Sequence, residues 1–257
     1  MTRIDSYEDL TDNIVGWLKD YYWMYNVKAF VVGVSGGIDS AVVSSLCART
    51  GLPTYVVCMP LESKFENTRL SDAHSKALVE KYENVKRIEV ELFSAYDSLI
   101  KSIEWWSEAQ HFDRKEFTSS DHAKANTKSR MRMVTLYQIA GSVGGIVVGT
   151  GNKVEDYGVG FYTKYGDGGV DIAPIADLYK TEVWELGEYL EVDQRIVDAD
   201  PTDGLWIDSR SDEEQLGASY AELEEAMETG TGPAVDVLKK FNEQNKHKML
   251  PIPTFKL

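Results

Sequence analysis

The sequence predicts an α/β protein built on a single open parallel sheet with helices on both faces. Short apolar runs rich in β-branched residues alternate along the chain with segments of helical periodicity, which is typical of repeated strand–helix units. One of these runs leads directly into a loop of small residues and the start of a helix. The 257 residues, 43% of them hydrophobic, can form one large domain or two small ones. The strands are expected at residues 29–34, 54–59, 85–90 and 146–149.

The N-terminal segment predicts a helix that packs on this sheet. Ser6 is a favoured N-cap residue. The aromatic run at 21–25 fits either a helix end packed on the sheet or a surface for a flat ring, and the packing interpretation is favoured. Apolar residues at helical spacing form the expected inner face: Leu10, Ile14, Trp17, Leu18 and Tyr21.

Further helices follow the strands in order. Gly51 is placed to end the helix after the first strand. The next helix is expected over 71–82, with Ala73, Ala77 and Leu78 facing inward. Later segments predict a helix from 93 with a polar surface excursion to 117, and helices at 121–142, 177–190, from 212, and at about 233–245.

The loop after the first strand has the composition of a phosphate-binding site. Unpaired N–H groups at a helix N-terminus attract anions, and glycines let the backbone approach a phosphate closely. Asp39 would repel a phosphate unless a cation lies between them, and Mg²⁺ is the natural candidate. A plain strand-to-helix turn is the alternative, and the number of matching positions after a strand disfavours it. The loop comprises Gly33, Val34, Ser35, Gly36, Gly37, Ile38, Asp39 and Ser40.

Polar residues near the start of the 121–142 helix have two interpretations. Asn126, Lys128, Arg130 and Arg132 form either a solvated helix face or a patch that binds phosphates or a carboxylate. The second interpretation suits arginine, whose guanidinium group binds both anions in a bidentate manner.

The segment from 149 to 180 carries a second set of candidates. Small residues and Glu155 follow the fourth strand, and 160–171 is rich in glycine, aromatic and charged residues at once. Lys180 lies in the expected first turn of a helix, where a cation opposes the helix dipole, so a bound anion is indicated. If the phosphate loop binds a nucleotide, Met59, at the carboxyl end of the second strand, would border its adenine side. The loop from about 200 to 212 has the length of a lid.

Composition narrows the function classes. The chain has 27 Lys and Arg against 42 Asp and Glu, a net charge of −15, which disfavours general nucleic-acid binding. Cys47 and Cys58 lie in apolar settings without metal or disulfide spacing. No apolar run is long enough for a membrane helix or signal peptide, so we expect a cytoplasmic protein.

Together these motifs resemble those of the ammonia-dependent NAD synthetase family. SGGIDS at 35–40 is similar to the pyrophosphate-binding loop of the PP-loop (N-type) ATP pyrophosphatases, the superfamily. The more specific motifs are GTGNKVE at 149–155, GFYTKYGDGGVD at 160–171, the PxxxLxK pattern ending at Lys180, and the PTxxL pattern from Pro201. The spacing between Glu155 and Phe161 departs from that of some members. The match covers nearly the whole chain.

The resemblance implies a reaction and an architecture. ATP would adenylylate the nicotinate carboxylate of deamido-NAD (nicotinic acid adenine dinucleotide) and release pyrophosphate, and ammonia would convert the acyl-adenylate into NAD and AMP. The fold would be Rossmann-like, of the adenine nucleotide alpha hydrolase type. One domain would span 1–257, with a lid at about 200–212, a C-terminal tail at 246–257 and no glutaminase domain. A homodimer in the cytoplasm is implied, with no nucleic-acid or membrane partner.

The resemblance also implies roles for individual residues. Asp39 and Glu155 would hold Mg²⁺, and Asp39, Asp167 and Lys180 would be catalytic, with Asp167 accepting a proton from ammonium. The ATP site would comprise the loop residues Gly33 to Ser40 together with Met59, Arg132, Thr150, Lys180 and Thr202. The deamido-NAD site would comprise Asn126, Arg130, Lys164, Asp167, Asp171, His247 and Lys248.

Two other function classes fit the phosphate loop. A tRNA-modifying ligase of the same superfamily would need a basic surface or further RNA-binding elements, and neither is visible in the sequence. A non-catalytic nucleotide-binding module would not need both Asp39 and Glu155, or both Lys164 and Asp167. Pyrophosphate release from ATP would separate the module from an enzyme, and turnover on tRNA would identify the ligase.

Overall fold

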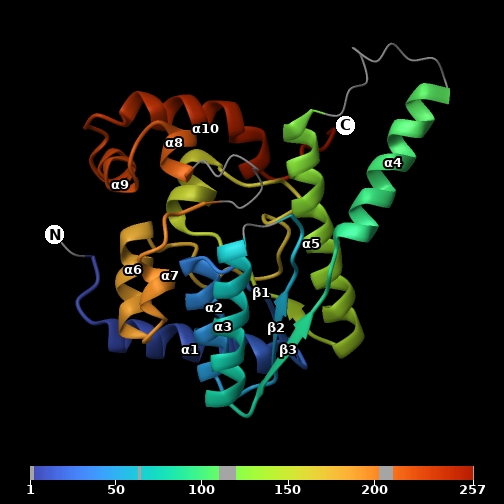
Figure 1. Cartoon of the computed structure of the whole chain (residues 1–257). Helices are drawn as coiled ribbons and strands as arrows, with labels where there is room; N and C mark the ends of the chain where they lie inside the picture. Colours follow the sequence, from blue (N-terminus) through green and yellow to red (C-terminus); the bar gives the residue numbers. More distant parts are fainter. Residues whose placement is uncertain (1–2, 63–64, 110–119, 203–210, 257) are drawn as a thin grey trace.

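A four-stranded parallel sheet forms the centre of the molecule (Figure 1). The computed structural model describes residues 3–62, 65–109, 120–202 and 211–256, and the statements below concern these residues. The strands lie in the order β3-β2-β1-β4, with Phe30 opposite both Thr54 and Ile146. Their bounds are β1 Phe30–Gly33, β2 Thr54–Cys58, β3 Val85–Glu89 and β4 Ile146–Val147.

The predicted open parallel sheet is therefore confirmed. The fourth strand is shorter than expected, because only two residues of β4 pair with β1. Beyond it, Val148 forms an isolated parallel bridge with Ile172. The sheet edge is thus continued by a segment that returns from the glycine-rich loop.

Helices cover both faces of the sheet because its side chains alternate in direction. Phe30 and Val32 pack into a cluster with α1, α2 and α6 on one face. Val31, Val57 and Val147 pack against α4 and α5 on the other. The helices of these two layers are α1 Tyr7–Met24, α2 Ile38–Arg49, α3 Phe65–Lys81, α4 Phe93–Ala109, α5 Asp121–Val143, α6 Lys180–Tyr189 and α7 Gln194–Val197.

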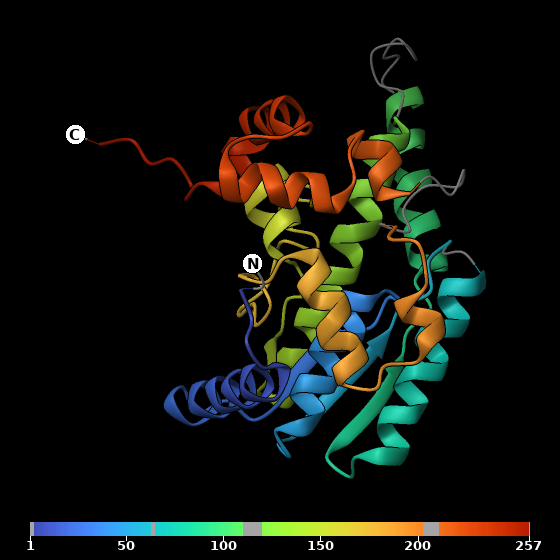
Figure 2. The same ribbon diagram turned by 90° about the vertical axis from the view of Figure 1, so that its left-hand side faces the viewer.

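The C-terminal helices form a separate group at one end of the sheet (Figures 1 and 2). They pack on a π-helical turn, η1, through an apolar cluster that includes Val154, Val159 and Leu223. These elements are η1 Val154–Val159, α8 Asp212–Leu216, α9 Tyr220–Thr229 and α10 Val235–Met249.

The N-terminal helix agrees with the prediction at its cap and differs on its inner face. The Ser6 side chain accepts a hydrogen bond from Asp9 N, as an N-cap does. Trp17, predicted to be inside, is 44% exposed. Within the aromatic run 21–25, packing on the sheet holds for Tyr22, whose ring lies 5.7 Å from that of Phe30, whereas the three residues after it are exposed.

Other helix boundaries shift from their predicted positions. Helix α3 begins at Phe65, ahead of the predicted 71, and buries small polar residues together with Leu70 and Leu78, while Ala77 is exposed. Helix α6 begins at Lys180 rather than at 177, because a turn spans residues 174–177 and Tyr179 is the N-cap of the helix. Helix α10 continues to Met249, so the predicted tail from 246 begins as helix. Gly51 ends α2 as predicted, with φ of +71°.

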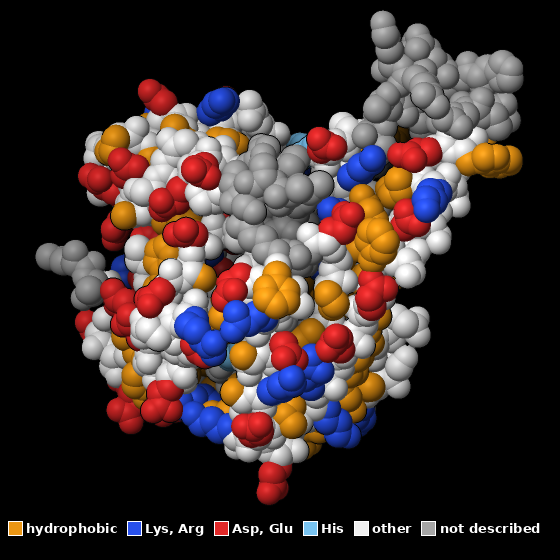
Figure 3. All heavy atoms as spheres, viewed as in Figure 1, with side chains coloured by type: hydrophobic (Ala, Val, Ile, Leu, Met, Phe, Trp, Pro, Cys, Tyr) orange, Lys and Arg blue, Asp and Glu red, His pale blue; other side chains and the backbone are white. Residues whose placement is uncertain are grey.

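Helix α4 extends away from the body of the molecule (Figure 1). Its side chains Leu99, Ile103, Trp105 and Trp106 are exposed, and hydrophobic atoms follow this helix in Figure 3. The excursion predicted to follow lies at 110–119, outside the described residues. On the face seen in Figure 3, basic side chains lie in small groups beside acidic ones. None of the described helices is long and apolar enough to cross a membrane.

Candidate active site

The predicted phosphate loop joins β1 to α2 and is closed by its own serine side chains. Ser40 Oγ accepts from Ser35 N at 3.1 Å and donates to Gly37 O at 3.0 Å, while Ser35 Oγ accepts from Gly37 N at 3.2 Å. Gly36 has φ of +95°, and a Cβ there would lie 2.3 Å from Asn67 O. This position therefore requires glycine, both for its conformation and for the close approach of α3.

A buried ion-pair cluster lies beside this loop. Lys180 Nζ is 2.6 Å from Asp39 Oδ2 and 3.0 Å from Glu155 Oε1. The Lys180 side chain is 3% exposed. The three residues come from α2, α6 and η1, which meet where the parallel strands end, the usual location of ligand sites in such sheets.

Two neutral side chains hold the carboxylates of this cluster. Asn152 Nδ2 donates to Asp39 Oδ1 at 3.0 Å, and Tyr220 Oη donates to Glu155 Oε1 at 2.8 Å. Burial alone would lower the pKa of Lys180, but the two carboxylates raise it above its usual value. Burial alone would raise the pKa of Glu155, but Lys180 and the Tyr220 hydroxyl hold that pKa below its usual value. Burial raises the pKa of Asp39 despite the neighbouring ammonium group, so the charged pair of this cluster is Lys180 with Glu155, and Asp39 binds a proton more readily than an exposed aspartate.

The glycine-rich segment 160–171 is held on helix α5. Asp167 Oδ1 accepts from Ser129 Oγ at 2.6 Å and from Thr163 N at 3.0 Å. Thr163 Oγ1 donates to Asn126 Oδ1 at 2.6 Å. Gly166 allows the close contact, because a Cβ there would lie 2.3 Å from Ser129 Oγ. Burial raises the pKa of Asp167, so this carboxyl group binds a proton more readily than an exposed aspartate.

The end of helix α10 lies against the same segment of its own chain. Lys248 Nζ donates to Gly160 O at 2.6 Å and to Tyr162 O at 2.8 Å. Lys164 Nζ donates to His247 O at 3.2 Å. The two basic residues predicted for a tail therefore lie on a helix that covers the glycine-rich segment.

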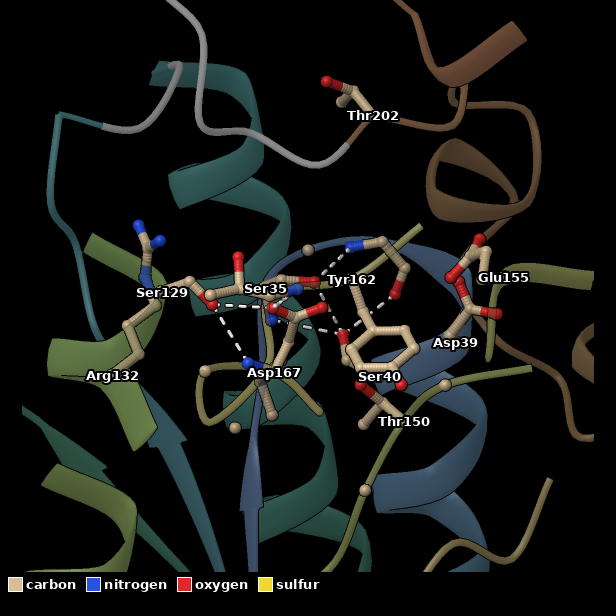
Figure 4. A pocket seen from close by; sticks show the side chains of 18 of the residues that line it. Ser35, Asp39, Ser40, Ser129, Arg132, Thr150, Glu155, Tyr162, Asp167 and Thr202 are labelled. Atoms are coloured by element: carbon tan, nitrogen blue, oxygen red, sulfur yellow. Dashed lines mark hydrogen bonds between the residues drawn. The ribbon is translucent and has the colours of Figure 1, made fainter. Parts of the chain in front are cut away.

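A cavity of about 920 Å³ joins these parts into one site (Figure 4). The view shows Asp39 and Glu155 together on one side and Asp167 beside Ser129 on the other. Asp156, Tyr162 and Gln244 also line it. The predicted site residues that line it are Gly33 to Ser40, Met59, Asn126, Arg132, Thr150, Glu155, Asp167, Lys180, Thr202 and Lys248.

Other predicted site residues lie outside the lining of this cavity. Arg130 is exposed and its Nε donates to Lys164 O at 3.3 Å. The Asp171 carboxylate accepts from Val147 N at 2.7 Å and from Tyr137 Oη at 3.0 Å, so it holds the end of β4. Lys164 and His247 are likewise not among the lining residues.

The polar start of α5 does not form one patch. Lys128 is buried and pairs with Glu62 at 2.7 Å, which is neither a solvated face nor a ligand site. Arg132 Nε donates to Met59 O at 3.4 Å at the edge of the cavity. Of the predicted lid, 203–210 lies outside the described residues, Thr202 borders the cavity, and α8 begins at Asp212 as expected.

Sequence reasoning missed several residues of the site. Tyr220 carries no signal of its own, because tyrosines are common in cores. Asn152 lies within the GTGNKVE motif at 149–155 but was given no role. Asp156 lines the cavity in η1, and its carboxylate lies so close to Gly151 that a Cβ there would be 2.2 Å from Oδ2. Burial is the larger cause, and the negative charge of Glu155 the next, of the rise in the pKa of Asp156 to about 7. The unusual spacing after Glu155 was the available signal, because π-helical turns accommodate extra residues at functional sites.

Comparison with known proteins identifies the family. A family model described as NAD synthase matches residues 10–253. The chain belongs to the NAD synthase family. An NH(3)-dependent NAD(+) synthetase of Carboxydothermus hydrogenoformans is 35% identical over 246 residues, 95% of each chain. The reaction of this family is the ATP-dependent amidation of deamido-NAD to NAD, so the predicted enzyme class and reaction are confirmed.

Solved structures agree with this assignment. A structure described as NMN synthetase from Francisella tularensis superposes with a TM-score of 0.86 at 32% identity, over 99% of this chain and 100% of that one. An NH3-dependent NAD synthetase from Campylobacter jejuni superposes with a TM-score of 0.75 at 24% identity, over 98% and 100% of the two chains. The second likeness supports the fold alone, and that fold is the Rossmann-like one expected. A match of this extent favours a NAD synthase over a tRNA-modifying ligase or a non-catalytic nucleotide-binding module.

Proposed function

We propose that this cavity carries out both steps of the family reaction, adenylylation of the substrate carboxylate and its amidation by free ammonia. The observation that supports this most is that one cavity is bordered by the phosphate loop, by the Asp39–Lys180–Glu155 cluster and by Asp167. A carboxylate is a poor electrophile. Transfer of AMP to it supplies a good leaving group, and ammonia then attacks the activated carbonyl carbon within the same enclosure.

The phosphate loop and its neighbours form the proposed ATP end. Ser35, Gly37 and Ser40 would hold the β- and γ-phosphates at the N-terminus of α2. Lys180 and Thr202 border the same space and would contact the phosphates. Groups that neutralise developing charge provide most of the catalysis in transfers of this kind. The adenine would lie beside Met59, Arg132 and Thr150.

Asp39 and Glu155 would hold Mg²⁺ at this end. Both carboxylates reach the same Lys180 Nζ, so their oxygens are close enough together to share one cation. Among the described residues, no group of three or more His, Cys, Asp or Glu side chains is placed to hold a metal. Mg²⁺ is commonly bound by one or two carboxylates plus substrate phosphates and water, and the donor set fits that pattern. The bound ion would neutralise phosphate charge.

Asp167 would accept a proton from ammonium, or from the attacking ammonia, at the other end of the cavity. Its burial raises its pKa, which makes it a stronger base, and Ser129 and Thr163 fix its orientation. Asn126 and Lys248 would bind deamido-NAD within the cavity. The contacts predicted for Arg130, Lys164, Asp171 and His247 stay predictions, since these residues would be reached only by parts of the dinucleotide outside the cavity.

The nitrogen donor and the exact nucleotide are open to direct test. Relatives at 32–36% identity are named NH(3)-dependent NAD(+) synthetase, which supports free ammonia as the donor. The relative named NMN synthetase matches over the full length, so nicotinic acid mononucleotide is a second candidate substrate. Purified protein would be supplied with ATP, Mg²⁺ and ammonium, and with either deamido-NAD or the mononucleotide. We expect NAD and AMP from deamido-NAD. Formation of neither NAD from deamido-NAD nor NMN from the mononucleotide would refute the proposal.

The remaining expectations concern assembly and location. We propose a single domain spanning 1–257, a homodimer, and a cytoplasmic location, all from the family resemblance. Limited proteolysis would test the first, sedimentation equilibrium the second, and cell fractionation the third.

A further inference from the structure

The ammonium group of Lys180 lies at the place proposed for the metal. Its Nζ is 2.6 Å from Asp39 Oδ2 and 3.0 Å from Glu155 Oε1, the two carboxylates that would bind Mg²⁺. The lysine is therefore more than a neighbour of the site. It already neutralises the oxygens that a divalent cation would use.

The surrounding side chains favour this arrangement. Asn152 and Tyr220 each donate to one of the carboxylates, and the Tyr220 ring centroid is 5.1 Å from Lys180 Nζ. A ring face at this distance attracts a cation. Both carboxylates are thus oriented toward a single positive charge.

A divalent cation and this ammonium group cannot share the position. Two cations between the same carboxylates would repel each other strongly, since charges separated by a few ångströms in a poorly solvated site interact strongly. A lysine side chain is flexible and can move its charge to another anion. The triphosphate of ATP, bound on the adjacent loop, would offer such an anion.

We propose that Lys180 occupies the metal position of the protein until a triphosphate binds, and then yields the two carboxylates to the divalent cation as its ammonium group moves to the phosphates. This inference rests on the proposed function, because it takes Asp39 and Glu155 as the metal ligands. It predicts that metal and nucleotide bind together, and that the protein without nucleotide has little affinity for free Mg²⁺.

The test measures Mn²⁺ binding to the full-length protein by electron paramagnetic resonance, without nucleotide and with α,β-methylene-ATP, which cannot release pyrophosphate. Lys180→Met removes the competing charge and leaves both carboxylates. Without nucleotide, we expect it to bind Mn²⁺ at least about tenfold more tightly than the wild type. Equal or weaker binding by the variant, or tight Mn²⁺ binding by the wild type without nucleotide, would overturn the proposal.

Lys153→Met is the matched control. Lys153 Nζ pairs with Asp177 at 2.7 Å, and that carboxylate is 85% exposed, so the substitution removes a nearby positive charge without opening the carboxylate pair. We expect Mn²⁺ binding close to that of the wild type. An increase equal to that of Lys180→Met would mean that net charge alone is responsible, which also contradicts the proposal.

Asp39→Asn separates failure of this inference from failure of the proposed metal site. With the nucleotide analogue present, its Mn²⁺ affinity should fall well below that of the wild type. If it does not, the proposed metal site is wrong. If it does, and Lys180→Met still gains nothing without nucleotide, only the exchange of lysine for metal is wrong.

The lysine variant leaves two buried carboxylates without their cation and can be unfolded on its own. In that case Mn²⁺ should restore the folded state, as measured by circular dichroism, because the metal replaces the missing charge. Recovery with Mn²⁺ but not with the same ionic strength of NaCl supports the proposal, and failure to recover in Mn²⁺ contradicts it.

Discussion

The hydroxyl group of Tyr220 is expected to stabilise the protein through Glu155. Tyr220 is 1% exposed, and its Oη donates to Glu155 Oε1 at 2.8 Å and lies 3.3 Å from Asp212 Oδ2. Burial, and after it the negative charge of Glu155, raise the pKa of this tyrosine. The hydroxyl group therefore keeps its proton and remains a donor. Tyr220→Phe removes this donor while leaving the ring packed against Trp184, 5.9 Å away between centroids.

The size of the effect follows from the charge on the acceptor. A hydrogen bond to a charged group contributes about 1.5–3 kcal/mol, whereas one between neutral groups contributes about 1 kcal/mol. We therefore expect Tyr220→Phe to lower the free energy of unfolding by about 1.5–3 kcal/mol. The measurement is urea denaturation monitored by circular dichroism. The m-values of the variant and the wild type should agree, so that the difference reports stability alone.

Tyr22→Phe is the matched control for this prediction. Tyr22 is also buried, at 8% exposure, but its hydroxyl donates to the neutral carbonyl of Lys28 at 3.4 Å. Its loss should cost no more than about 1 kcal/mol. Equal losses in the two variants, or no loss at Tyr220, would refute the view that this hydroxyl supports a charged Glu155.

Three further predictions concern the loop and the acidic groups of the cavity. Gly36→Ala should abolish ATP binding measured by calorimetry, because φ of +95° and the contact with Asn67 O exclude a Cβ; unchanged affinity would contradict the geometry. Asp167→Asn should lower kcat strongly and leave the KM for ATP nearly unchanged, since only the proposed proton acceptor is lost; a wild-type kcat would exclude this role. Asp156 has a folded pKa of about 7 against an ordinary 3.8, so its stabilising contribution is complete at low pH and is lost as pH rises through 7. The free energy of unfolding of the wild type, measured with a chelator present, should therefore fall between about pH 4 and about pH 7, by at most about 4 kcal/mol. Asp156→Asn should remove much of that fall in urea titrations; equal slopes would contradict the assignment.

The sheet and the phosphate loop could be predicted because their signals are local. β-branched runs indicate strands, and the residues from Ser35 to Ser40 carry the loop within a few positions. The hydrogen bonds of these serines with each other and with Gly37 were not predicted and are a finding of the structure. The same locality explains the confirmed caps at Ser6 and Gly51.

Contacts between distant segments could not be predicted in this way. The hydroxyl of Tyr220 meets Glu155 across 65 positions of sequence, and the ion pair of Lys180 with Asp39 spans 141 positions. No periodicity encodes either contact. Thr181 illustrates the same point, since its N and Oγ1 donate to Glu224 at 3.0 and 2.6 Å and fix the first turn of α6.

Errors on helix faces have a different origin. Trp17 was placed inside because it is apolar and in phase with Leu10 and Ile14. The buried line of α1 runs instead through Thr11, Ile14, Leu18 and Tyr22, and Trp17 lies beside it at 44% exposure. Ala77 was placed inside for the same reason, while small polar residues of α3 are buried instead. Spacing indicates a helix, but the face that is buried depends on the elements against which the helix packs, and polar residues such as Thr11 and Ser75 can lie on that face.

The central claim is that one cavity amidates deamido-NAD with free ammonia at the expense of ATP. The most direct test is NAD formation by the purified protein from deamido-NAD, ATP and Mg²⁺, with ammonium chloride in one reaction and glutamine in a parallel one. We predict NAD and AMP in equal amounts with ammonium and none with glutamine. Folded protein that binds ATP but forms no NAD in either reaction would contradict the account.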